Sequence, residues 1–346
     1  MLDEARDDDA PDGAGGPSVF GTAGPGRVAR LTLLAVVVLA TSVRMYLAFV
    51  AAPTHWVLDP TNILRGASLA PNQYRVLTPL LCALVGLALG DAHEADEVVQ
   101  LLSIVACNAV LVWALLRETA SLELSTVGLV AFFGACANTM AWRNRETFLE
   151  ALLALLGFLL VTRPRPRWVA FAVVSVLGAL NRETWGFVWC GAAASTIVSA
   201  GGLRRLLGEP SRRRDALGLA VAGVLSLATL VAVRARYGIK PYHTELWMMG
   251  TNIANLAPWR DPELVVAKGV WTLGAGLGCA YLLSLSRGGR RHLPFVAGFA
   301  APMLVASFFL ASWFEPRIFT ALYPLLIIAL VGVAARRHET PSPRLR

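Results

Sequence analysis

The chain has 346 residues, of which 56% are hydrophobic and 16% are charged, and its mean hydropathy is +0.58. This composition excludes an ordinary soluble globular protein. Apolar stretches long enough to cross a hydrocarbon core of about 30 Å recur along almost the whole length. The net charge of +8 does not indicate a nucleic-acid partner, because the basic residues stand in short loops between apolar stretches and act as topology determinants. The sequence predicts an all-α, polytopic transmembrane helical bundle with ten or eleven spans and short loops.

Residues 1–26 are acidic and then rich in Gly, Pro and Ala, so we expect a disordered N-terminal tail. The acidic start argues against a cleaved signal peptide, which begins with basic residues. Residues 27–336 form the predicted transmembrane helical domain, and residues 337–346 a cytoplasmic C-terminal tail. The five cysteines each stand alone in an apolar stretch without metal-ligand or redox spacing, so we expect neither a metal nor a cofactor.

The first predicted span covers residues 28–51, and the preceding Arg27 together with Arg30 favours a cytoplasmic N-terminus. Further spans are predicted at residues 97–117, 122–142, 146–162, 168–182, 184–200, 217–235, 264–285, 293–311 and 317–335. The apolar segment 76–90 leaves two topologies open. If it crosses, there are eleven crossings and the loop that carries Asp59 is inside. If it does not, there are ten crossings and that loop is outside, which we prefer because the N-terminal arginines then stay cytoplasmic.

The tetrapeptide Asn-Arg-Glu-Thr occurs twice, at residues 144–147 and 181–184. The two copies flank two apolar runs that are joined by a basic turn with Arg163, Arg165 and Arg167. The simplest structure for this unit is a membrane helical hairpin. Because the chain crosses and returns, both tetrads are predicted at one membrane face. Three arginines in a short loop mark the cytoplasmic side, so the tetrads are predicted on the outer face.

The predicted outer face gathers ionisable and aromatic residues, and such residues close to membrane depth indicate a functional site. The candidates are Asp59, Tyr74, Arg75, Arg145, Glu146, Arg182, Glu183, His243, Trp247, Glu315 and Arg317. Arginine offers a fork of donors that suits phosphate, and a helix N-terminus adds unpaired N–H groups. These residues suit an anionic lipid head group with a carboxylate nearby as base.

Each candidate also has a purely structural interpretation. Each tetrad can simply start a helix, because Asn is a preferred N-cap and a Glu in the first turn complements the helix dipole. Asp59, which precedes a proline, can be a turn former. The pair Tyr74-Arg75 can be an interfacial anchor, and His243 an interfacial hydrogen-bonded residue. Trp247 fits an aromatic belt or a platform for a sugar ring.

A set of short motifs is shared with a known superfamily. The segment YRVLTP at residues 74–79 opens an apolar piece after an aspartate-bearing loop, an NRET heads a later span, and the turn EPR at residues 315–317 precedes a last span with a proline at 324. In these motifs the chain, from about residue 28 to 335, resembles bacterial polytopic membrane proteins related to the GT-C glycosyltransferase superfamily.

That superfamily generally transfers a sugar from a polyprenyl-phosphate carrier at the outer leaflet, with an acidic residue of the first outside loop as base. The resemblance implies that Asp59 deprotonates the acceptor hydroxyl, and that Arg75, Arg182 and Arg317 hold the donor phosphate. Glu183 and Glu315 are the other catalytic candidates. The expected partners are membrane lipid and a polyprenyl-phosphate sugar donor, and the expected location is the bacterial cytoplasmic (inner) membrane, with multiple crossings.

Two other functions stay open from the sequence. A transporter or flippase of an anionic or lipid-linked solute needs polar residues at mid-membrane depth and broken helices. Most predicted spans are apolar in their middles, with Arg44 as the main exception. The third function is that of a non-catalytic membrane assembly subunit.

Overall fold

The computed structural model describes residues 25–51, 59–70, 72–137, 145–240, 287–310 and 319–339. The helices in these ranges are α1 (Pro25–Ala51), α2 (Pro60–Leu64), the 3-10 helix η2 (Asn72–Tyr74), α3 (Leu77–Leu89), α4 (Ala92–Thr119), α5 (Leu122–Ala137), α6 (Thr147–Val161), α7 (Trp168–Asn181), α8 (Trp185–Ser199), α9 (Leu203–Gly208), the 3-10 helix η3 (Pro210–Arg212), α10 (Arg213–Tyr237), α14 (Arg287–Leu310) and α15 (Tyr323–Glu339). Within the described ranges there are helices and no strands, so the prediction of an all-α fold is confirmed.

Some predictions fall outside the described residues. They are the span at residues 264–285, the candidates His243, Trp247, Glu315 and Arg317, the first 24 residues of the predicted tail, and residues 340–346. The predicted span 293–311 corresponds to α14, which begins six residues earlier, at Arg287. The predicted span 317–335 corresponds to α15, which begins at Tyr323 and is described to Glu339.

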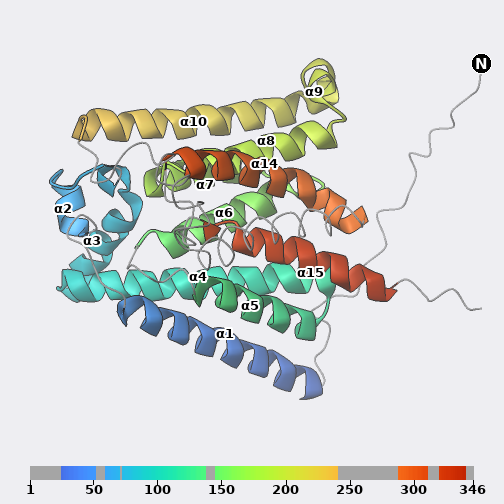
Figure 1. Ribbon diagram of the computed structural model, residues 1–346, viewed down its shortest axis with the longest axis horizontal. Coiled ribbons are helices and arrows are strands. Elements are labelled where there is room, and N and C mark those ends of the chain that lie inside the picture. Colours follow the sequence, from blue (N-terminus) through green and yellow to red (C-terminus); the bar gives the residue numbers. More distant parts are fainter. Residues whose placement is uncertain are drawn as a thin grey trace, which may run out of the picture.

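The long helices lie side by side in a bundle, with α10 along one edge and α1 along the opposite edge (Figure 1). Helix α6 lies inside, and its sequence TFLEALLALLGFLLV explains why. A helix that is apolar around its whole circumference needs cover on every side. Phe148, Leu155 and Phe158 are accordingly fully buried in the main hydrophobic core.

Among the described residues, three helices are long and apolar enough to cross a membrane, at residues Val28–Ala51, Glu94–Thr119 and Pro210–Tyr237. The first and third expose large apolar side chains, such as Leu33 (65%) and Val224 (66%). Apolar surface of this extent indicates contact with lipid rather than water. These helices indicate that the chain is a membrane protein.

The helices α6, α7 and α8 are shorter than the sequence analysis expected, with 15, 14 and 15 residues. Each is only about 22 Å long, whereas a straight crossing takes roughly 20 residues. The predicted spans ran one residue further, at Glu146, Arg182 and Thr184 of the tetrads and also at Thr162 and Ala200.

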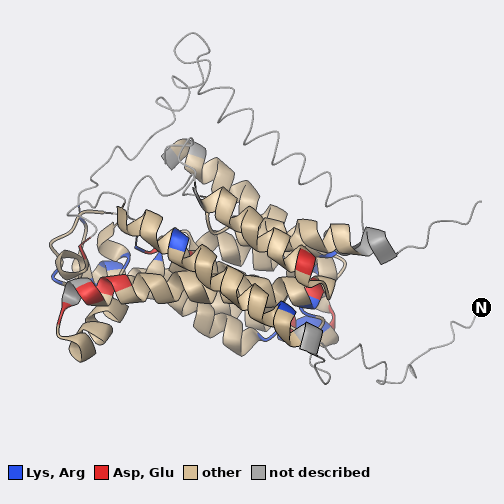
Figure 2. Cartoon of the chain, turned by 90° about the horizontal axis from the view of Figure 1, so that it is seen from below, with Lys and Arg blue, Asp and Glu red and all other residues tan. Residues whose placement is uncertain are grey.

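Charged residues gather at the two ends of the bundle, and its middle is almost entirely uncharged (Figure 2). Helices α2 and α3 lie at the end where α4 begins (Figure 1). Arg75, before α3, pairs with Glu146, and Asp96, after α3, pairs with the neighbouring Arg145. The segment 76–90 therefore starts and ends at one end of the bundle.

Candidate functional site

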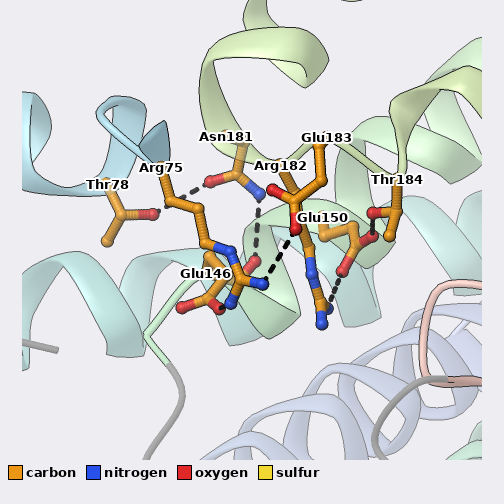
Figure 3. Close-up of polar contacts among 8 residues, drawn as sticks. All are labelled: Arg75, Thr78, Glu146, Glu150, Asn181, Arg182, Glu183 and Thr184. Carbon is orange, nitrogen blue, oxygen red and sulfur yellow. Dashed lines mark hydrogen bonds and ion pairs between the residues drawn. The ribbon is translucent and has the colours of Figure 1, made fainter. Parts of the chain in front are cut away.

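The two tetrads, residues 144–147 and 181–184, meet at a single arginine. Arg75, between η2 and α3, donates through Nη1 to Oε1 of Glu146 and through Nη2 to Oε1 of Glu183, the latter at 3.0 Å (Figure 3). The hairpin of α6 and α7 brings both glutamates to the same level of the bundle. One glutamate of each tetrad thus shares one guanidinium group.

A third ion pair lies beside the two of Arg75 and involves Glu150, a residue that was not selected from the sequence. Arg182 donates through Nη1 to Oε2 of Glu150 at 2.5 Å, and the Thr184 hydroxyl donates to the other oxygen of that carboxylate. Glu150 follows Glu146 by four residues on α6, so both carboxylates lie on one face of the helix. In the sequence only the four-residue spacing from Glu146 pointed to Glu150, because the rest of this stretch is apolar and predicts a buried core.

The third arginine pairs with α4. The Nε atom of Arg145 donates to Oδ2 of Asp96 at 2.8 Å, and the Asp96 side chain is almost completely buried. The Sγ atom of Cys82 on α3 lies 3.8 Å from the other Asp96 oxygen. Asp96 was not among the candidates selected from the sequence.

The asparagine of the second tetrad does not cap a helix, so the N-cap interpretation is wrong for this copy. Asn181 ends α7, and its Nδ2 donates across the hairpin to the backbone oxygen of Glu146 at 3.1 Å. The Thr78 hydroxyl donates to Oδ1 of Asn181 at 3.0 Å. This side chain joins α3, α6 and α7 because an amide offers both a donor and an acceptor. Asn144 of the first tetrad lies outside the described residues.

Two sequence candidates have structural roles. The Asp59 carboxylate caps α2 and accepts hydrogen bonds from the backbone N–H groups of Thr61 (2.7 Å) and Asn62 (3.3 Å). Among the described residues Asp59 makes no contact with the arginines of the cluster. Tyr74 ties η2 to the chain after α10, because its hydroxyl donates to the Gly238 carbonyl at 3.0 Å and accepts from the Lys240 N–H at 3.1 Å.

We call the four ion pairs that these three arginines make the tetrad cluster. It consists of Arg75, Arg145, Arg182, Asp96, Glu146, Glu150 and Glu183. Three guanidinium groups face four carboxyl groups in this cluster. Charges held out of water in this way are stable only when they are paired and hydrogen-bonded.

Arg75 and Glu183 each stabilise the charged form of the other. Burial alone raises the pKa of the Glu183 carboxyl, but Arg75 and Arg182 outweigh burial and hold that pKa below its usual value. Burial opposes the charge of Arg75, yet Glu183 and Glu146 raise the pKa of its guanidinium further above its usual range. Both groups are therefore ionised at neutral pH.

This shift predicts a loss of stability on the acid side. Because the folded pKa of Glu183 lies below its ordinary value of 4.5, the stabilisation is complete above that value and is lost as the pH falls through the folded pKa. The melting temperature, followed from neutral pH to about pH 3, is expected to fall less steeply in E183Q than in the parent protein. Equal slopes would show that this ion pair does not contribute.

A small cavity opens onto the cluster. It has a volume of about 10 Å³, and its lining includes Arg75, Arg145 and Glu146 together with Ile63 of α2. A space of this size holds roughly one water molecule. In the cluster and the adjoining Trp185, four buried atoms have no hydrogen-bond partner among the described residues: Nε of Arg75, which lines the cavity, Nε of Arg182, Oε2 of Glu183 and Nε1 of Trp185. Buried polar groups without a protein partner are uncommon, and they favour a polar ligand or water as the partner.

The described residues do not form a metal centre, since no three His, Cys, Asp or Glu side chains come together as ligands within those ranges. The cluster instead offers guanidinium groups for an anion and one carboxylate oxygen for a proton.

No known protein indicates the function of the chain, so the geometry of the site is the basis for it. Neither protein-family models, curated proteins nor solved structures gave a match to the chain.

Proposed function

We propose that the chain is a multi-pass protein of a bacterial inner membrane with ten crossings, and that the tetrad cluster lies on the outer face. The support is the distribution of charge. Arg30 lies near the start of α1, Arg117 in the last turn of α4 and Arg163 just after α6, whereas the cluster lies at the start of α6 and of α4, so these arginines mark the opposite, cytoplasmic side. The segment 76–90 returns to the end from which it starts, which suits the ten-crossing topology.

The proposed reaction is transfer of a sugar from a polyprenyl-phosphate carrier, with Glu183 as the general base. Oε2 of Glu183 is the one carboxylate oxygen of the cluster that is buried without a partner among the described residues. This observation carries the proposal, because an uncommitted oxygen on an ionised carboxylate can accept a proton. Asp59 is less suited, since its carboxylate caps α2.

In this mechanism Glu183 takes the proton of the acceptor hydroxyl. The acceptor oxygen then attacks the anomeric carbon, and the bond from that carbon to the carrier phosphate breaks. The phosphate leaves with the bonding electron pair, and Arg75 and Arg182 stabilise its charge. Because Arg75 already binds two carboxylates, the donor phosphate must displace one of them, and the small cavity must widen as it enters.

The test uses E183Q and the matched variant E94Q in membranes supplied with labelled polyprenyl-phosphate sugars. The amide introduced by E183Q keeps the hydrogen bond to Arg75 but cannot take a proton. E183Q is expected to lose transfer by about 100-fold or more, the usual effect of losing a general base. Glu94 is exposed in the first turn of α4, so E94Q is expected to keep the parent rate.

Two results would overturn the assignment. Equal transfer rates for E183Q and E94Q would remove Glu183 as base. Absence of transfer by the parent protein across the panel of lipid-linked sugars would remove the reaction itself.

A non-catalytic assembly subunit is the second candidate, and the pairing within the cluster favours it. Each of the three arginines has a carboxylate partner, as a purely structural network requires. For such a protein E183Q and E94Q would be equivalent in every transfer assay, whereas disruption of the cluster would still reduce the amount of folded protein. The E183Q experiment therefore separates the two candidates.

A further inference from the structure

A second polar cavity lies at the opposite end of the bundle, where α6 and α8 end and α10 and α14 begin. Its volume is about 210 Å³, far larger than the cavity at the tetrad cluster. The lining residues that matter here are Arg163, Arg212, Arg291, Ser195, Thr196 and Ser199. We call it the basic cavity. None of these residues contributes to the proposed transfer reaction.

Two of the arginines are fixed by the end of α6. Nε of Arg163 donates to the carbonyl of Leu159 at 3.1 Å, and Nη2 of Arg291 donates to the carbonyl of Thr162 at 2.7 Å. A guanidinium group has five N–H donors, and within the described residues these are the only hydrogen bonds of the two groups. Both arginines are thus positioned by one donor while other donors stay available.

Positive charge exceeds negative charge around this cavity. Among the described residues that line it, Asp215 is the only acidic one. Its carboxylate accepts a hydrogen bond from Nε1 of Trp168 at 2.8 Å and lies 3.8 Å from Arg212. Within the described residues no carboxylate pairs with Arg163 or Arg291.

The excess positive charge around the cavity also affects the guanidinium group of Arg163. Partial burial, and then repulsion from Arg117 and Arg167, lower the pKa of its guanidinium. Helix dipoles do not remove the excess, because α6 and α8 end at the cavity while α10 and α14 begin there, and the opposed partial charges offset one another. An anion placed in the cavity would relieve the repulsion.

We propose that the basic cavity binds a phosphate group, carried either by the head group of an anionic phospholipid or by a soluble phosphate compound. Arg163, Arg212 and Arg291 supply charge-assisted hydrogen bonds to its oxygens, and Ser195 and Ser199 add hydroxyl donors. Basic pockets between membrane helices on the cytoplasmic side are suited to such head groups. The proposal does not depend on the transfer reaction, since the two sites lie at opposite ends of α6.

The experiment places a competing carboxylate in the cavity. Ser199 is an exposed lining residue, so S199D adds a negative charge beside the arginines without disturbing the core. The matched control is S211D, which adds the same charge at an exposed position near the start of α10, outside the lining. A second pair of variants, R163Q/R291Q against R165Q, removes positive charge from the cavity or from the exposed turn next to it.

Two binding assays distinguish the sources of the phosphate. In neutral detergent, inorganic phosphate is titrated against the purified full chain while the melting temperature is followed. In lipid nanodiscs of phosphatidylcholine mixed with phosphatidylglycerol, the lipid retained by the protein after extraction is identified by mass spectrometry. Roughly tenfold weaker binding is expected in S199D and R163Q/R291Q, because each disrupts charge-assisted hydrogen bonds, whereas S211D and R165Q should match the parent.

A response to inorganic phosphate that depends on the cavity supports a soluble ligand, and selective retention of phosphatidylglycerol supports a lipid head group. No binding in either assay would overturn the proposal. Binding of equal strength in S199D and S211D, or in R163Q/R291Q and R165Q, would overturn it as well, because the anion would then bind elsewhere.

Discussion

Replacing Arg75 with methionine is expected to lower the free energy of unfolding by about 3–5 kcal/mol, as is typical when one partner of a buried ion pair is removed. Methionine has a similar length but no charge, so Glu146 and Glu183 would lose their shared partner. Glu146 is only 4% exposed and could regain water only by moving out of the bundle. The measurement is thermal or denaturant unfolding of the purified protein in detergent.

The control for this variant is R65M. Arg65 follows α2 at the same end of the bundle but is exposed, so its replacement is expected to change stability by no more than about 0.5 kcal/mol. The triple variant R75M/E146Q/E183Q should recover part of the loss, because it removes the charges of the two carboxylates that R75M deprives of their shared arginine. If R75M and R65M have equal stability, the tetrad cluster does not stabilise the fold.

Replacing Gly178 with alanine is expected to destabilise the protein by about 1–3 kcal/mol, the usual cost of overpacking a filled core. A methyl group at this position would overlap Cδ2 and Cε3 of the Trp185 ring. Trp185 is only 2% exposed and begins α8, directly after the second tetrad. Because the ring cannot turn away into free space, α7 and α8 must separate, and we expect Glu183 to move with them.

Gly186 provides the matched control, because a methyl group there meets no atom within 4 Å. G186A is expected to leave stability unchanged or to raise it by up to about 1 kcal/mol, since alanine favours a helix more than glycine does. The two variants make the same chemical change eight residues apart and should differ in sign. A melting temperature of G178A at or above that of G186A would show that the α7–α8 contact tolerates expansion.

The helical class and most helix positions were predictable from the sequence, because apolar runs separated by basic turns leave few alternatives in a lipid environment. The closeness of the two tetrads also followed from local information. A helix, a turn and a second helix necessarily bring residues 146 and 183 to the same level. The structure corrects the ends of these helices by a few residues, because hydropathy does not show where a polar tetrad leaves the helix.

The partners within the cluster were not predictable in the same way. Arg75 lies 71 residues before Glu146 and 108 before Glu183, and no local pattern specifies a contact over such distances. Glu150 was missed because a single carboxylate in an apolar helix does not alter the hydropathy of its surroundings. For Asp59 the motif-based resemblance predicts a base, which stays a prediction, while the structure adds a role that the resemblance did not indicate, as the N-cap of α2.

The sequence separation within the tetrad cluster also affects how the protein is made. With synthesis at roughly 5–20 residues per second, Arg75 leaves the ribosome about 5–20 seconds before Glu183, its more distant partner. During that interval the nascent chain holds a charged arginine at the membrane without its carboxylates. Synthesis of the α6–α7 hairpin supplies both glutamates, so we expect this hairpin to determine when Arg75 and the early helices become fixed in the bundle.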